Sequence, residues 1–155
     1  MEVEREHIAT FVVATIAVLV IVGGFASFSG LSVYDQPLKL ELQKTEFMQG
    51  DVFDANVVVN PVTFMADETI MVYIDGNAVA AIALKRYLDD NDIDYGSEVK
   101  NLGQNNVEII NLQGPLTVNL ADYVSMEPMY PGTVHILSVE FSQGDAAAQE
   151  SFRVG

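Results

Sequence analysis

The feature that most constrains this chain is a stretch without charged residues at positions 8–28. As an α-helix, these roughly 21 residues would be about 31 Å long, close to the thickness of the hydrocarbon core of a bilayer. Such a helix is apolar on every face, so water solvates it poorly. The sequence therefore predicts an apolar transmembrane or filament-core helix within residues 1–30, a tether at 31–37 and a folded domain at 38–155.

The residues around the apolar stretch predict that it is retained and that the domain lies outside the cell. A cleavable signal peptide has a positive n-region and an apolar core of about 7–15 residues. Here the first seven residues hold Arg5 and three glutamates, and the apolar stretch exceeds that range, although Ser27 and Ser29 would permit cleavage before Gly30. Because Arg5 is the only basic residue before Lys39, the positive-inside rule places the N-terminus in the cytoplasm.

Small residues recur at helical spacing within the apolar stretch. Thr10 and Ala14 are four residues apart, and so are Gly23 and Ser27. Pairs of this kind let two membrane helices approach closely, although small residues are frequent in any membrane helix. We identify these four residues as candidates for helix–helix packing.

Composition narrows the function of the domain. The chain has no cysteine, which excludes disulfides, cysteine-bound zinc and a thiol nucleophile. Its formal net charge is −15, with 22 acidic and 7 basic residues, so a phosphate-binding face is not expected. This balance argues against nucleic acid and against an anionic lipid surface as partners. It is typical of a well-solvated surface, and it is also compatible with bound divalent cations or a salt-rich habitat.

After residue 30 the continuous apolar pattern gives way to alternation and turn signals. Asp75-Gly76 is a strong hairpin signal, because both positions of a tight primed turn require positive φ. Short strands separated by turns, without a long amphipathic helix, predict an antiparallel β-sandwich. We expect strands at 39–43, 52–60, 69–74, 78–84, 107–112, 116–120, 133–141 and 147–154, and one helical turn at 121–124.

The strand expected at 133–141 carries the clearest alternation. Val134, Ile136, Val139 and Phe141 are interpreted as its inward residues, which requires a bulge at Leu137-Ser138. His135 then becomes a half-exposed strand residue. The methionines and aromatic residues, including Phe64, Met65, Met71, Met126, Met129 and Tyr130, are interpreted mainly as packing residues, with the loop at 126–131 as a candidate contact surface.

Two segments carry a resemblance to a known family. Lys44, Phe47 and Gly50-Asp51 form a Lys-x-x-Phe-x-x-Gly-Asp segment, and Pro131-Gly132 precedes the penultimate strand. Both resemble immunoglobulin-like domains of prokaryotic surface proteins, in which a tyrosine is usual at the position of His135. The resemblance implies an immunoglobulin-like sandwich over most of residues 38–155. It rests on turn chemistry and so implies no activity.

The arrangement of an N-terminal apolar helix before a β-rich domain is also similar to archaeal pilins and archaellins. In that family the apolar helices bundle into the core of a filament. This chain departs from the family because it lacks a basic leader, and because Arg5 stands where type IV pilins have glutamate. The similarity implies a filament subunit as a second interpretation.

An acidic run at 89–98 is the one candidate metal site. Asp90, Asp92 and Asp94 alternate, and Glu98 follows four residues later. Calcium takes six to eight oxygen ligands, which acidic side chains at every second loop position can supply. The EF-hand pattern fails, because Tyr95 and Asn101 occupy its sixth and twelfth positions. A calcium loop of another kind and a solvated acidic loop both remain open.

No pattern in the sequence indicates catalysis. The only histidines are His7, beside the apolar stretch, and His135, within a predicted strand. Nucleophile, metalloprotease and phosphate-loop motifs are absent. The sequence therefore predicts a non-enzymatic cell-surface protein, anchored by one helix, whose immunoglobulin-like domain contacts other surface proteins or a second copy. A pilin-like subunit of an extracellular filament is the alternative.

Overall fold

The computed structural model describes residues 36–126 and 129–155, which belong to one unit that extends from Gln36 to Gly155. The apolar stretch at 8–28 lies outside the described residues, as do its candidate packing residues Thr10, Ala14, Gly23 and Ser27. The anchor and its packing therefore stay predictions. Within the described ranges, no helix combines the length and the apolar character needed to cross a membrane.

Most of the described chain is β-strand. Each of the eight predicted strands corresponds to an observed one, whereas the short strands β2 and β4, the strand β7 and the helix α2 were not predicted. The elements are β1 (Leu38–Leu42), β2 (Glu46–Phe47), β3 (Ala55–Val59), β4 (Thr63–Met65), β5 (Thr69–Ile74), β6 (Asn77–Ala83), α2 (Leu84–Asp90), β7 (Gly96–Leu102), β8 (Asn105–Asn111), β9 (Leu116–Asn119), the 3₁₀ helix η1 (Leu120–Asp122), β10 (Val134–Phe141) and β11 (Ala147–Val154).

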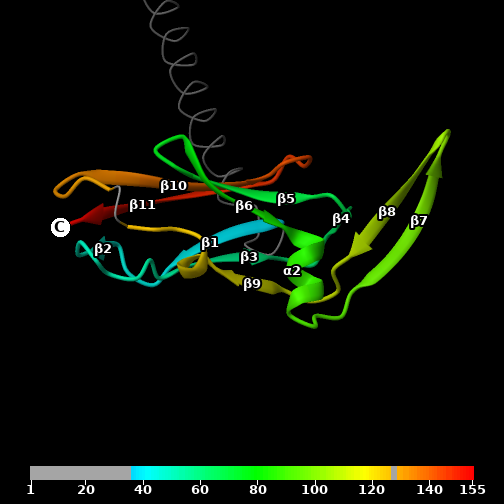
Figure 1. Ribbon diagram of the computed structural model, residues 1–155, viewed down its shortest axis with the longest axis horizontal. Coiled ribbons are helices and arrows are strands. Elements are labelled where there is room, and N and C mark those ends of the chain that lie inside the picture. Colours follow the sequence, from blue (N-terminus) through cyan, green and yellow to red (C-terminus); the bar gives the residue numbers. More distant parts are fainter. Residues whose placement is uncertain (1–35, 127–128) are drawn as a thin grey trace, which may run out of the picture. The chain divides into compact units, whose positions relative to one another are not determined.

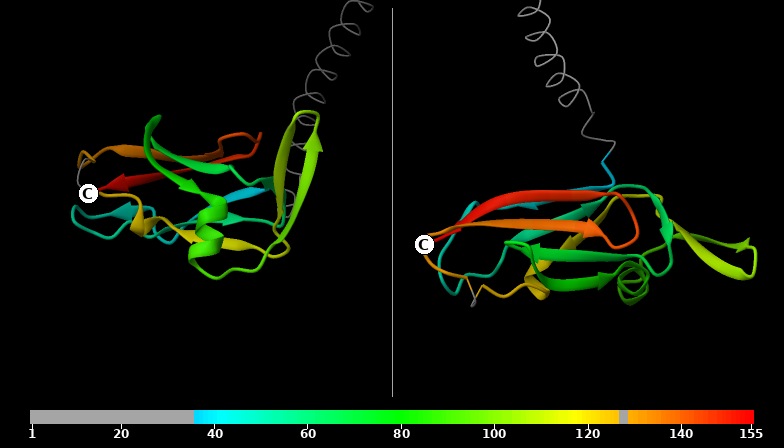
Figure 2. Two further views of the ribbon diagram at one scale, coloured as in Figure 1. Left: turned by 45° about the vertical axis from the view of Figure 1, so that its right-hand side comes forward. Right: turned by 90° about the horizontal axis from the view of Figure 1, so that it is seen from above.

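The strands form three sheets. One has the order β1-β3-β9, the second β2-β11-β10-β5-β6, and the third β4-β8-β7. Every pairing is antiparallel except the parallel pair of β2 with β11. The first two sheets lie face to face (Figures 1 and 2), so the predicted antiparallel β-sandwich is confirmed.

Alternating side chains of the two large sheets fill one hydrophobic core. Val57 of β3 and Leu137 of β10 are both fully buried in it. At one end of the core the rings of Phe47, Phe53 and Phe152 pack together, with centroids 5.2–5.7 Å apart. Aromatic side chains bury large apolar areas and gain from tilted or edge-to-face contact, so this trio is a main source of stability.

The segment that resembles immunoglobulin-like domains places Phe47 in this core. Gly50 has a φ of +91°, a conformation that glycine adopts without strain. The Lys44 ammonium forms an ion pair with Asp51 and lies 4.9 Å from the centroid of the Phe47 ring. The turn therefore closes over the buried ring, which explains the spacing of these residues.

The expected orientation of the first half of β10 is wrong. His135 and Leu137 face the core, whereas Val134 is 58% and Ile136 45% exposed. Pairing of β10 with β11 and with β5 continues without a break through Leu137 and Ser138, so the predicted bulge there is also wrong. A shift of one residue exchanges the two faces of a strand. Apolar alternation failed as a guide because a charged partner, Asp75, allows His135 to point inward.

The register irregularity lies elsewhere in the same sheet. Val72 of β5 pairs with Ala80, and the next residue, Tyr73, pairs with Ala78. Val79 is thus an additional residue in β6. The hairpin predicted at Asp75-Gly76 is confirmed, and both of its turn residues have positive φ.

Strands β7 and β8 form a long hairpin that projects from the sandwich (Figures 1 and 2), which we call the arm (residues 96–111). Pairing runs along its whole length, from Gly96 with Asn111 to Leu102 with Asn105. Near its base β4 pairs with β8 and joins the arm to the domain. The arm was missed as a hairpin because β7 has no apolar alternation.

Truncation of Phe152 tests the importance of the aromatic trio. We expect Phe152→Ala to lower the free energy of unfolding by about 3–5 kcal/mol, because it leaves a cavity between Phe47 and Phe53. Val134→Ala, at an exposed position of β10, should change it by less than about 0.5 kcal/mol. Urea unfolding followed by circular dichroism measures both. Similar losses for the two variants would contradict this description of the core.

Candidate functional site

The acidic run at 89–98 begins in the last turn of α2. The helix ends at Asp90, within this run. Leu84 and Leu88, one helical turn apart, are buried, and the chain reverses after Asn91. The amide of Ile93 donates to the carbonyl of Leu88 at 3.0 Å, and that of Asp92 donates to the carbonyl of Asp89 at 3.3 Å. These two bonds, with Asp92 at a φ of +51°, form a Schellman motif. Asp92 is therefore required to adopt a left-handed conformation.

The carboxylates of the run face different partners. Asp90 lies 3.4 Å from Arg86 Nε, and Glu98 lies 2.9 Å from Lys100 Nζ. The Tyr95 hydroxyl donates to Asp89 at 2.6 Å. In residues 36–126 and 129–155, no three His, Asp or Glu side chains are grouped as metal ligands would be. The structure thus does not gather Asp90, Asp92, Asp94 and Glu98, and calcium stays a prediction without geometric support.

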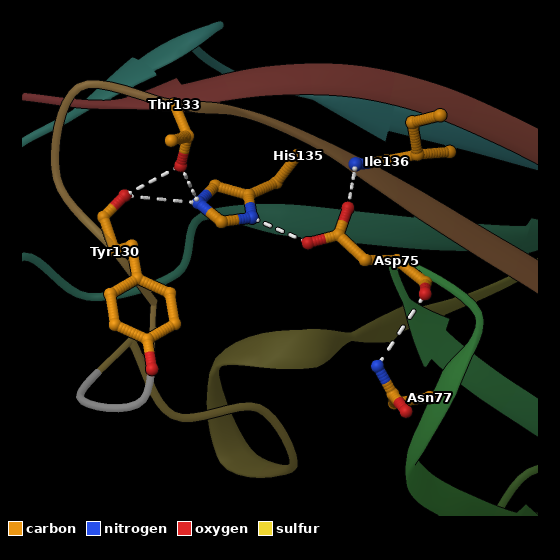
Figure 3. A network of polar contacts seen from close by, with 6 residues as sticks. All are labelled: Asp75, Asn77, Tyr130, Thr133, His135 and Ile136. Carbon is orange, nitrogen blue, oxygen red and sulfur yellow. Dashed lines mark hydrogen bonds and ion pairs between the residues drawn. The ribbon is translucent and has the colours of Figure 1, made fainter.

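The most connected polar cluster surrounds His135 (Figure 3). This side chain is only 5% exposed, so the expected half-exposed position is wrong. Its Nδ1 lies 2.6 Å from Oδ2 of Asp75, and its Nε2 lies 2.9 Å from Thr133 Oγ1 and 3.2 Å from the Tyr130 carbonyl oxygen. The second carboxylate oxygen of Asp75 accepts the Ile136 amide at 2.9 Å. We call these residues the histidine clasp.

The hydrogen bonds define the protonation state of the histidine clasp. The Thr133 hydroxyl donates to the Tyr130 carbonyl at 2.8 Å, so it presents a lone pair to His135 Nε2. Both neighbours of Nε2 are then acceptors, and the neighbour of Nδ1 is the Asp75 carboxylate. This arrangement favours a proton on each ring nitrogen, and we assign His135 as an imidazolium paired with Asp75.

The pKa directions agree with this assignment. Burial disfavours the charged ring, but the hydrogen bonds to Asp75 and to the Tyr130 carbonyl outweigh it, and the pKa of His135 is raised above 6.5. The hydrogen bond from His135, followed by that from the Ile136 amide, lowers the pKa of Asp75 below 3.8. Each partner thus favours the charged form of the other.

The order Thr133–His135–Asp75 superficially resembles a nucleophile, base and orienting acid. A general base needs an unprotonated nitrogen facing the hydroxyl that it activates. Here Nε2 donates, and the hydroxyl proton is directed to the Tyr130 carbonyl. The histidine clasp is therefore suited to holding the β5–β6 turn, the loop before β10 and β10 together. Sequence reasoning missed it because its two charged members are 60 residues apart.

A second feature that was not predicted is a cavity of about 510 Å³ with a buried acid in its wall. Glu68 is only 3% exposed and lines this cavity. Its Oε1 accepts from the Thr69 amide at 3.1 Å, the Ser142 hydroxyl at 2.9 Å and the Gln143 amide at 3.0 Å. These bonds join the turn before β5 to the β10–β11 turn. A lone glutamate between loops carries no recognisable signal in the sequence.

The packing role expected for the methionines and aromatic residues is confirmed at three of the six positions. Phe64, Met126 and Met129 are buried in the core, whereas Tyr130 is exposed. Met65 and Met71 are partly exposed. The loop at 126–131 therefore presents Tyr130 to solvent and turns its described methionines inward.

Comparisons with known proteins leave the function to be inferred from this geometry. A scan against protein-family models, a search of curated proteins and a search of solved structures each found no match to the chain.

Replacement of Asp92 tests whether this residue matters for its left-handed backbone conformation or as a ligand of calcium. Because a left-handed conformation is unfavourable for a residue with a Cβ, and a carboxylate is unfavourable at a helix C-terminus, we expect Asp92→Gly to stabilise the protein by about 1 kcal/mol. Urea unfolding with calcium and with EGTA measures this. A loss of stability that appears only with calcium would contradict the backbone role and indicate a ligand.

The histidine clasp predicts a pH-dependent stability. The raised pKa of His135 stabilises the fold below about pH 6.5, and this contribution is lost as the pH rises through the folded-state pKa. The lowered pKa of Asp75 stabilises above about pH 3.8 and is lost on acidification below that value. The difference in Tm between the wild type and His135→Gln should therefore shrink by about 3 °C or more between pH 5.5 and pH 9. A difference that stays constant over this range would contradict the ion pair.

Proposed function

We propose that this chain is a non-enzymatic cell-surface protein in which residues 8–28 anchor an immunoglobulin-like domain that makes protein–protein contacts in an envelope assembly. The observation that carries the contact role is the projecting arm. Its strand β7 lies at the edge of a three-stranded sheet and exposes Val99 to 68% and Leu102 to 62%. Large apolar side chains on an unprotected edge strand favour association, so a partner that covers them accounts for their exposure.

The topology supports the immunoglobulin-like part of the proposal. If β1, β3 and β9 are taken as strands A, B and E, they form one sheet, as in immunoglobulin domains. Strands β5, β6, β10 and β11 then correspond to C, C′, F and G of the opposite sheet. The arm is inserted between C′ and E, where it lengthens the domain without disturbing either sheet. This fold commonly presents binding surfaces on its loops and edges.

The histidine clasp supports the part of the proposal that the protein is not an enzyme. An imidazolium that is buried and surrounded by acceptors has no lone pair with which to activate the Thr133 hydroxyl. The net charge of −15 argues against nucleic acid and anionic lipid as partners, because both would be repelled.

Cell fractionation tests the proposed location. Protease added to intact cells should remove residues 36–155, and the full chain should be extracted from membranes only by detergent. Complete protection of the domain would contradict an outward orientation. Recovery of chains that retain residues 8–28 in sheared filaments would instead support the pilin-like filament subunit.

Polar substitutions in the arm test the proposed contact. We expect Val99→Ser combined with Leu102→Ser to lower chemical cross-linking of the chain to other envelope proteins on intact cells by about tenfold, while Tm stays unchanged because both side chains are exposed. The matched control is Val52→Ser, at a comparably exposed residue outside the arm. Equal cross-linking by the arm variant and the wild type would contradict the contact role.

A further inference from the structure

The cavity beside Glu68 offers an acidic group in an apolar setting. It is lined by residues of β4, by the β10–β11 turn at Gln143–Ala146 and by Ile109 at the base of the arm. The side chains of Thr63, Met65 and Ile109 share one face of the sheet, because Met65 pairs with Ile109 and Thr63 with Asn111. We call this concave surface the groove. Among the described residues, no lysine or arginine lines it.

One carboxylate oxygen of Glu68 has no hydrogen-bond partner among the described residues. All side-chain hydrogen bonds of Glu68 to those residues end on Oε1, whereas its backbone amide and carbonyl pair with Met65 and Leu84. Among the described side chains, no fully buried oxygen or nitrogen lacks a hydrogen-bond partner. Oε2 is therefore not a fully buried atom, and Glu68, which is 3% exposed, is one of the residues that line the cavity. A carboxylate oxygen in such a poorly solvated position favours a cationic donor.

The groove continues along one face of the arm. Cross-strand pairs join Ile109 to Glu98 and Val107 to Lys100, and Leu102 lies two residues beyond Lys100. Cross-strand partners share a face of the sheet, and so do alternate residues of one strand. From its base to its tip, this face of the arm therefore presents Ile109, then Val107 and Lys100, then Leu102. The side chains of Lys100 and Glu98, which form an ion pair, are both more than half exposed. Lys100 can therefore leave Glu98 for another carboxylate with little loss of free energy.

We propose that two copies of the chain pair through this surface, with the arm of each copy lying in the groove of the other and Lys100 facing Glu68 across the interface. The inference rests on the proposed contact function and names a second copy as the partner. A surface that contains both a cationic donor and its acidic acceptor is self-complementary under a two-fold axis. The exposed Leu102 would then be covered by the apolar wall of the groove.

Cross-linking of the full chain in detergent micelles tests the pairing directly. Because the chain has no cysteine, single-cysteine variants report one position each. A Leu102→Cys copy mixed with a differently tagged Asp145→Cys copy, at the rim of the groove, should form a mixed disulfide under mild oxidation. We expect at least about tenfold more product than with Val134→Cys, an exposed residue on another face, in place of Leu102→Cys. The mixture should contain about 0.5 M NaCl, which screens the repulsion between two acidic copies.

Neutral substitutions then test the ion pair. Glu68→Gln keeps an oxygen acceptor for the three donors that Oε1 binds, and Lys100→Gln changes an exposed side chain, so both variants should fold. Each should lower the association constant about tenfold, which equals about 1.4 kcal/mol, and the double variant should lose no more than either single one. Lys39→Gln, which removes a positive charge from β1, is the matched control and should have no effect.

Two results would overturn the inference. One is a yield of the Leu102→Cys and Asp145→Cys pair no higher than that with Val134→Cys. The other is a cross-link that Glu68→Gln and Lys100→Gln leave unchanged. Either result leaves the proposed function intact if Val99→Ser with Leu102→Ser still abolishes contacts on cells, since the arm would then contact a different protein.

Discussion

The ion pair between His135 and Asp75 is the interaction on which the arrangement of the central sheet depends. It allows a histidine to occupy an inward position of β10, against the ring of Phe152 at a centroid distance of 5.5 Å. With His135 inward, Leu137, Val139 and Phe141 follow it into the core, and Val134 and Ile136 point to solvent. The same carboxylate holds the β5–β6 turn against β10 through the Ile136 amide. This pair of charges thus allows His135 to share the buried face of β10 with Leu137, Val139 and Phe141, and it holds a neighbouring turn in place.

Local patterns were sufficient to predict most strands of this domain. Turn residues such as Asp75-Gly76, and alternation in segments such as Thr69–Ile74, act over a few residues and can be read directly from the sequence. The orientation of the first half of β10 could not be predicted in this way, because the inward position of His135 depends on a partner 60 residues away. The arm was missed for another reason. Its strand β7 is solvent-exposed nearly throughout, so it lacks the alternation that a buried face imposes.

The acidic residues show why composition is a poor guide to a site. Asp92 acts through its backbone at the end of α2, Asp75 forms an ion pair with the buried His135, and Glu68 joins two turns through one of its carboxylate oxygens. In the sequence these residues are equivalent members of an acidic excess. Their roles differ because burial and donors differ, and both follow from tertiary structure. The predicted calcium ligands were chosen by spacing alone, and in the structure two of them, Asp90 and Glu98, form ion pairs with Arg86 and Lys100 instead.

The central claim is that the described domain is a scaffold for contacts, stabilised by a charged His135 rather than equipped with a histidine base. Long-range ¹H–¹⁵N correlation NMR of the histidine side chains measures this most directly, with His135 assigned by comparison with His135→Gln. We expect both ring nitrogens of His135 to be mainly protonated at pH 6.5, because the hydrogen bonds to Asp75 and to the Tyr130 carbonyl raise the pKa of His135 above that value. A neutral ring at pH 6.5 with its unprotonated Nε2 facing Thr133 would contradict the account, because that tautomer is the one a catalytic base requires.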